Sequence, residues 1–159
     1  MKNSLVFWSI AVVALAQSRL RKVEPAGNVV FVCEHGTAKS LIAREWFNRL
    51  AAERGLGIRA ISRGVTPETS VPPAVFDALR KDGFDVSGFA PLAFSAADAS
   101  SAVRVVGIGV DLSAVAQQGD ARWEAWEGIP PASQRYVAAR DALRARIETL
   151  LETLGGSLR

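Results

Sequence analysis

Cysteine and histidine are nearly absent from this chain. Its 159 residues include one cysteine, Cys33, and one histidine, His35. A single cysteine excludes an internal disulfide, and this shortage excludes zinc sites built from several Cys and His ligands. We therefore expect no metal site and no cofactor.

A strong excess of charge of one sign is also missing. The net charge is +3, and the densest basic cluster is RLRK at residues 19–22. Nucleic-acid binding generally needs a basic patch, so we expect no nucleic-acid partner. Hydrophobic residues make up 49% of the chain and charged residues 22%, which is typical of a folded domain. The length suits a single domain with a proper core.

Long apolar runs are missing except near the N-terminus. Residues 4–16 (SLVFWSIAVVALA) are too short to span a bilayer comfortably, and small residues at their end predict cleavage after Ala16. More positive charge follows this run than precedes it, which is unusual for an exported chain. We interpret residues 1–16 as a signal peptide or an N-terminal anchor, with a start codon assigned too early as the third alternative.

These alternatives decide the expected location. A cleaved signal would give a secreted or periplasmic protein. An uncleaved segment would leave it cytoplasmic or membrane-anchored, with membrane contact only through residues 4–16. Export would carry a free thiol into an oxidising space, which favours a cytoplasmic face or a non-catalytic role. Residues 17–27 are interpreted as a linker and residues 28–155 as the folded domain.

Predicted strands and helices alternate along this domain. The continuous apolar run 29–33 predicts a strand buried on both faces. The remaining expected elements are a helix at 38–54, a strand at 57–62, a helix at 72–82, a strand at 103–108, a short strand at 122–126 and a helix from Ser133 to about Leu154. This order predicts an α/β three-layer sandwich with a four-stranded parallel sheet.

Each long helix has a predicted apolar face. In helix 38–54 the inward residues are Leu41, Ile42, Trp46, Phe47 and Leu50. In the C-terminal helix they are Val137, Ile147, Leu150, Leu151 and Leu154. The arginines of that helix, at positions 135, 140, 144 and 146, are expected to form a solvated face.

The stretch CEHGTAKS, residues 33–40, joins the first strand to the first helix. Backbone amides in such a turn and the helix dipole create an anion site, which favours the thiolate form of Cys33. Ser40 can donate a hydrogen bond to the thiolate, and Lys39 can reach a bound oxyanion as a point charge. The pattern favours sulfur attack on phosphate or arsenate. A lone cysteine at a strand end is also typical of a small buried apolar residue.

The chain resembles the low-molecular-weight protein tyrosine phosphatases and the phosphatase-like arsenate reductases. Their loop runs Cys, five residues, Arg, Ser/Thr after the first strand, and NVVFVCEHGTAKSLIAREWF matches it without a gap. Three later stretches match in order: ISRGVTPETSVPPAVFDALRKDGFDVSG, VRVVGIGVDL and WEGIPPASQRYVAARDALRARIETLLETL. The histidine at position 35 resembles the loop variant that is common in the arsenate reductases. The resemblance covers nearly all of residues 28–154.

The resemblance implies a cysteine-dependent phosphatase fold and a set of site residues. The catalytic residues would be Cys33, Lys39 and Ser40. Backbone amides along the loop would bind the oxyanion, at Glu34, His35, Gly36, Thr37 and Ala38. The implied ligands are phosphate, arsenate, or a phosphorylated protein or small molecule.

Two positions depart from the family pattern. Lys39 stands where the family has arginine, so the planar fork that grips two oxygens is lost. The position of the family's general-acid aspartate is occupied here by Pro130, which cannot donate a proton. Glu127 is the nearest carboxylate that could substitute, and Asp111 and Asp120 are weaker alternatives.

Three functions stay open. The first is a phosphatase of impaired activity on phosphomonoesters of the phosphotyrosine type. The second is an arsenate reductase-like enzyme that needs an external thiol, because the chain has no second cysteine. The third is a module that binds an oxyanion or a phosphorylated partner without turnover.

Overall fold

The computed structural model describes residues 27–115 and 120–157, so the predictions for residues 1–26 lie outside the described part. The elements in chain order are β1 (Asn28–Cys33), α1 (Lys39–Glu53), β2 (Arg59–Gly64), α2 (Pro73–Lys81), α3 (Ala96–Ser101), β3 (Ala102–Ile108), β4 (Trp123–Trp126) and α4 (Tyr136–Ser157). Each predicted strand and helix is present, with bounds that differ by up to three residues. No helix in the described ranges is both long and apolar enough to cross a membrane.

The four strands form one parallel sheet in the order β2-β1-β3-β4. The predicted α/β fold with a four-stranded parallel sheet is therefore confirmed. Cys33, at the end of β1, pairs with Gly64, at the end of β2. The carboxyl ends of these two neighbouring strands thus meet at the same edge, where parallel sheets bind ligands.

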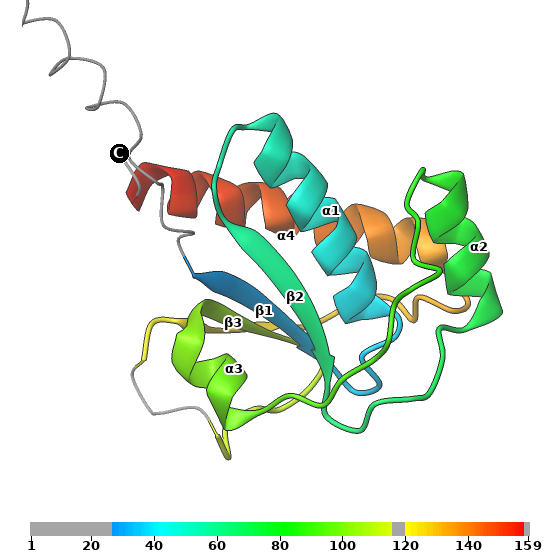
Figure 1. Ribbon diagram of the computed structural model, residues 1–159, viewed down its shortest axis with the longest axis horizontal. Coiled ribbons are helices and arrows are strands. Elements are labelled where there is room, and N and C mark those ends of the chain that lie inside the picture. The colour runs from blue at the N-terminus through cyan, green and yellow to red at the C-terminus, as the bar shows by residue number, and fades with distance from the viewer. Residues whose placement is uncertain (1–26, 116–119, 158–159) are drawn as a thin grey trace, which may run out of the picture.

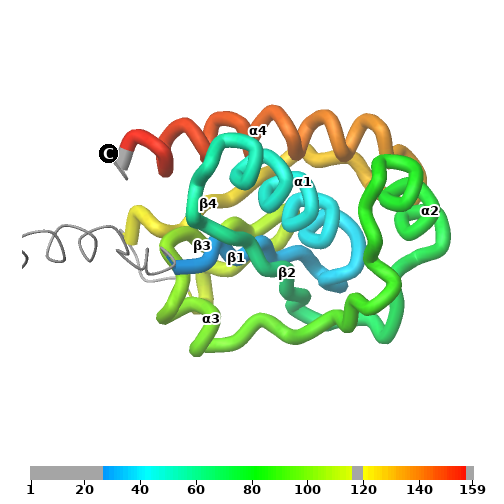
Figure 2. Tube along the Cα trace, turned by 45° about the horizontal axis from the view of Figure 1, so that its top comes forward, coloured from blue at the N-terminus to red at the C-terminus, as the bar shows by residue number. Residues whose placement is uncertain are grey.

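Alternation along β1 divides the core into two parts. Val29, Phe31 and Cys33 face the larger cluster, which packs against α1, α2 and α4. Val30 and Val32 face a smaller cluster on the opposite side. Figures 1 and 2 show α1, α2 and α4 on one side of the sheet and α3 on the other. The sandwich therefore has three layers of very unequal thickness.

Phe31 lies at the centre of the larger cluster and is fully buried. Its ring centroid lies 5.8 Å from that of Phe47 on α1 and 5.5 Å from that of Trp126 on β4. Truncation of such a residue to alanine generally costs about 3–5 kcal/mol. This packing holds α1 in a defined position on the strand that carries Cys33.

Helix α4 begins later than predicted. The Pro131 carbonyl accepts hydrogen bonds from the amides of Gln134 and Arg135, so a separate turn comes before the helix. Val137, predicted to face inward, is 58% exposed. It lies about 200° around the helix from the buried Ala139, because successive residues are rotated by about 100°. The helix also continues through the glycines at 155 and 156 to Ser157.

Two arginines of α4 are not part of a solvated face, contrary to the prediction. Arg140 forms an ion pair with Asp82, at 3.2 Å, and the Tyr136 hydroxyl donates to the same carboxylate at 2.7 Å. Burial and this hydrogen bond raise the pKa of Tyr136. Arg144 stacks over the Trp46 ring, 4.3 Å from its centroid. These contacts attach Asp82, at the end of α2, and the partly buried Trp46 of α1 to α4.

Helix α3 has no counterpart among the predicted elements. It has no buried residue, so the apolar periodicity that marks a packed helix is absent. Its start carries a capping box, in which Ser95 accepts from the Asp98 amide and Asp98 accepts from the Ser95 amide. The Ser-x-x-Asp pattern was the one available signal for this helix.

Candidate active site

The loop after β1 packs closely against the end of β2. Gly36 has φ of 69°, in the left-handed region that glycine adopts without strain. A Cβ on Gly36 would lie 2.8 Å from the Gly64 nitrogen, and a Cβ on Gly64 would lie 2.8 Å from the Gly36 nitrogen. The absence of a side chain at both positions therefore allows the loop to reach this conformation.

Hydrogen bonds hold the carbonyl side of the loop. The carbonyl oxygens of Cys33, Glu34 and His35 accept from amides of residues 65, 66 and 68, at 3.0, 2.8 and 3.1 Å. The amides of residues 34–40 have no protein acceptor within the described ranges. These amides are consequently available to a ligand.

The start of α1 has no cap of its own. Ala38 occupies the N-cap position and provides no side-chain oxygen, and the first turn contains no acidic residue. The first amides of a helix carry partial positive charge and normally need an acceptor. Together with the free loop amides, they form a site suited to an anion.

Cys33 lies at the base of this site. It is 5% exposed, and its Sγ lies 3.1 Å from Oγ of the fully buried Ser40. The predicted contact between Ser40 and the thiol is therefore present. A hydroxyl in this position can donate to a thiolate and stabilise its charge.

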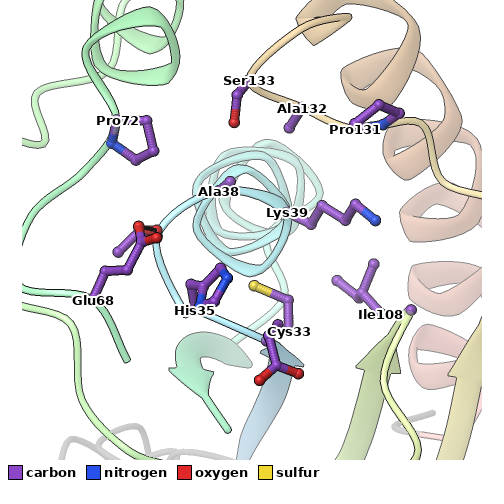
Figure 3. A pocket seen from close by; sticks show the side chains of 13 residues that line it. Cys33, His35, Ala38, Lys39, Glu68, Pro72, Ile108, Pro131, Ala132 and Ser133 are labelled. Atoms are coloured by element: carbon purple, nitrogen blue, oxygen red, sulfur yellow. Dashed lines mark hydrogen bonds between the residues drawn. The ribbon is translucent and has the colours of Figure 1, made fainter. Parts of the chain in front are cut away.

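A cavity of about 240 Å³ opens above Cys33. Its lining residues come from the loop, from the β2–α2 connection, from the end of β3 and from the segment before α4: Cys33, Glu34, His35, Thr37, Ala38, Lys39, Glu68, Pro72, Ile108, Gly109, Pro131, Ala132 and Ser133. Figure 3 shows most of them around the thiol. Of the predicted loop residues, Gly36 and Ser40 do not line the cavity, and both are buried.

The side chains of His35 and Lys39 are placed differently. His35 lies beside Cys33, and its Nδ1 donates to the Thr66 carbonyl at 3.3 Å, since a carbonyl oxygen can only accept. Lys39 extends from the start of α1 toward the wall formed by Ile108 and Pro131 (Figure 3). Its Nζ would lie 3.3 Å from a Cβ on Gly109. No arginine lines the cavity, so Lys39 is its strongest positive charge.

The sequence did not predict Glu68 as a site residue, yet its side chain lines the cavity. Its carboxylate accepts a hydrogen bond from Thr37 Oγ1 at 3.0 Å. Residue 68 lies in a loop between predicted elements, where sequence patterns do not determine which side chain turns inward. Its position shortly after the carboxyl end of a strand was the only available indication.

The predicted substitute acids lie away from the cavity. Glu127 lines a separate hollow together with Asp111, and its carbonyl accepts from Arg146 at 2.5 Å. Asp120 borders a third hollow, and hydrogen bonds from Arg122 lower its pKa to about 2. The expectation that Glu127 could serve this site is therefore corrected. The segment before α4 does reach the cavity, but it contributes Pro131 and its two successors rather than Pro130.

A family model matches more than half of the chain. The sequence model described as low molecular weight phosphotyrosine protein phosphatase matches residues 28–113. No curated protein sequence matches the chain significantly.

Several solved structures share the fold. One is a thioredoxin-dependent arsenate reductase from Corynebacterium glutamicum, with a TM-score of 0.70, 22% identity and coverage of 85% of this chain. The match spans 65% of the length of that reductase. A low molecular weight protein tyrosine phosphatase from T. tengcongensis gives a TM-score of 0.70 at 21% identity, over 80% of this chain and 99% of the other. An arsenate reductase in the phosphate binding state gives 0.62 at 24% identity, over 80% and 98%.

Proposed function

The chain belongs to the low molecular weight phosphotyrosine protein phosphatase family, and from this premise we propose that it hydrolyses phosphate monoesters through Cys33. The observation that carries the proposal is the position of the Cys33 sulfur. It lies beneath free loop amides and an uncapped helix start, 3.1 Å from a buried serine hydroxyl. That combination suits a nucleophile that attacks a tetrahedral oxyanion.

In the proposed reaction, the oxygens of the phosphoryl group accept hydrogen bonds from the amides of residues 34–39. The Cys33 thiolate attacks phosphorus, the ester P–O bond breaks with its electron pair on the departing oxygen, and that oxygen takes up a proton as the alcohol leaves. Water then hydrolyses the phosphocysteine to inorganic phosphate and regenerates the thiolate. Ser40 supports the sulfur when it carries negative charge, before the attack and after the hydrolysis. The amides act most strongly when charge accumulates on the phosphoryl oxygens.

We expect this activity to be slow. Lys39 provides charge without the bidentate grip of a guanidinium, and no arginine lines the cavity. The loss of a bidentate contact to the transition state costs on the order of two to three powers of ten in rate. The test is turnover of 4-nitrophenyl phosphate by the purified protein, compared with Cys33→Ser. We expect slow turnover that Cys33→Ser abolishes, and turnover that does not depend on Cys33 would refute the proposal.

A binding module is the second candidate, favoured by the lack of a guanidinium at the cavity. In this case the loop amides hold phosphate or a phosphorylated partner and no bond breaks. Calorimetric titration of inorganic phosphate into the wild type and Cys33→Ser distinguishes it. Binding without turnover supports the module, and an absence of binding removes both candidates.

An arsenate reductase-like activity is the third candidate, favoured by the shared fold with an arsenate reductase in the phosphate binding state. Cys33 is the only cysteine, so an external thiol would have to resolve the Cys33–arsenate adduct. Arsenite production from arsenate, measured with and without added glutathione, tests this candidate. Production that requires both Cys33 and the added thiol would support it.

A further inference from the structure

Glu68 is attached to the oxyanion loop at two points. Its backbone amide donates to the His35 carbonyl at 3.1 Å, and its Oε2 accepts from Thr37 Oγ1 at 3.0 Å. Thr37 is 1% exposed, so its hydroxyl has a fixed position. Both the backbone and the carboxylate of Glu68 are therefore held relative to Cys33.

The second oxygen of this carboxylate is free. Oε1 has no hydrogen bond or ion pair within the described ranges, and Glu68 lines the same cavity as the thiol. Figure 3 shows the carboxylate on one side of Cys33 while Lys39 extends on the other side. A ligand in the cavity thus meets a positioned carboxyl oxygen.

In-line displacement determines where a proton donor must be. The departing oxygen lies on the side of phosphorus opposite the sulfur, toward the cavity walls and mouth. Glu68 comes from the β2–α2 connection, which forms such a wall, whereas Glu34, the other carboxylate of the lining, directly follows the nucleophile in the loop. The segment before α4 provides no carboxyl group to the lining.

We propose that Glu68 is the proton donor of this site, an inference that rests on the phosphatase function proposed above. The Cys33 sulfur forms a bond to phosphorus, and the ester P–O bond breaks with its electron pair on the departing oxygen. That oxygen takes the proton of Glu68, which leaves an alcohol, a phosphocysteine and a carboxylate. Water then attacks phosphorus and returns a proton to Glu68, which releases phosphate and the thiolate. Thr37 acts as a positioning residue for the carboxyl group.

The test compares two substrates that differ in their need for a proton. Nitrophenolate leaves readily as an anion, whereas phenolate leaves poorly. Removal of the acid should lower the rate with phenyl phosphate by about a hundred- to ten-thousandfold. The rate with 4-nitrophenyl phosphate should change far less. The measured quantity is the ratio of the two kcat values, for the wild type, Glu68→Gln, Glu34→Gln and Glu127→Gln.

We expect the ratio of phenyl to nitrophenyl turnover to fall in Glu68→Gln and to stay constant in Glu127→Gln. Thr37→Val should lower the ratio in part, and Thr37→Ser should restore it, because only the hydroxyl positions the carboxyl group. Circular dichroism verifies that each variant is folded.

Three outcomes overturn the inference. An unchanged ratio in Glu68→Gln, with turnover that still depends on Cys33, removes the role of Glu68 and leaves the phosphatase function standing. A fall in Glu34→Gln instead assigns the proton to that residue. If no Cys33-dependent turnover occurs with either substrate, the proposed phosphatase function is wrong, and so is the assignment of Glu68 as its proton donor.

Discussion

Gly36 and Gly64 lie in direct backbone contact, and a Cβ on either would come within 2.8 Å of the other's nitrogen. One residue belongs to the loop that surrounds Cys33, and the other ends the neighbouring strand β2. The shape of the anion site thus depends on two glycines that are 28 positions apart in the sequence (64 minus 36).

The first prediction concerns this contact. Gly64→Ala should force the loop away from β2, with a cost of about 1–3 kcal/mol in the free energy of unfolding, because the opposing atoms are backbone. Phosphate affinity should fall with it. Gly88→Ala is the matched control, since nothing lies within 4 Å of a Cβ there. Urea unfolding and phosphate titration of both variants make the comparison, and equal behaviour would contradict the expectation.

Ser40→Ala should lower turnover without loss of the fold. Among the residues that the structure describes, this hydroxyl is the one hydrogen-bond partner of the Cys33 sulfur, at 3.1 Å, and a hydrogen bond to a charged group contributes about 1.5–3 kcal/mol. We therefore expect kcat with 4-nitrophenyl phosphate to fall by about ten- to a hundredfold. Ser40→Cys or Ser40→Thr, which retain a donor, should lose less. An undiminished rate in Ser40→Ala would mean that the hydroxyl does not support the thiolate.

Lys39→Arg should increase the rate. A guanidinium can grip two phosphoryl oxygens where an ammonium offers a single charge, and this gain is on the order of a hundredfold. The control is Lys81→Arg, which makes the same chemical change at an exposed position at the end of α2. Steady-state kinetics with 4-nitrophenyl phosphate measures both. If Lys39→Arg leaves the rate unchanged, the binding module becomes the better description of this protein.

Gly109→Ala should change the position of the Lys39 ammonium. Gly109 has φ of 62°, and its added Cβ would lie 3.3 Å from Lys39 Nζ. Gly128→Ala separates the two effects, since φ is 74° there and no atom lies within 4 Å of a Cβ. Both variants should lose about 1–2 kcal/mol of stability through the left-handed backbone. Only Gly109→Ala should alter phosphate affinity. An equal change in phosphate affinity in both variants would mean that the position of Lys39 beside Gly109 does not matter for anion binding.

The ion pair between Arg63 and Asp98 should make stability depend on pH in acid. Burial raises the pKa of Asp98, but hydrogen bonds from Arg63 and Ser95 lower it by more, so the folded pKa lies below the usual value of 3.8. The contribution is present above that unfolded value and is lost as the pH falls through the folded one. Urea unfolding at neutral pH and near pH 3 should show a smaller acid loss in Asp98→Asn than in the wild type. An identical loss in both proteins would rule out this carboxylate as a cause.

Much of the fold could be predicted because its signals are local. The apolar run ending in Cys33 and the periodic apolar face of α1 each reflect a requirement that neighbouring residues satisfy. The bounds of α4 and the exposure of Val137 could not be predicted this way. They depend on a turn at Pro131 and on which helix face meets the sheet. Helix α3 was missed because its start depends on a capping box and none of its residues is buried.

The same division applies to the site. The sequence was enough to predict Cys33 as the candidate nucleophile, together with its loop and the helix that follows, because Cys33, Gly36 and Ser40 lie within one short segment. It also predicted two departures from the family pattern, Lys39 in place of the loop arginine and Pro130 in place of the aspartate. The folded chain was needed to see that Glu68 reaches the cavity, that Glu127 does not, and that Lys39 lies against Gly109. The physical reason is that these relationships join separate segments of the chain, whose distances are set by how the strands align and how the connections fold back over them.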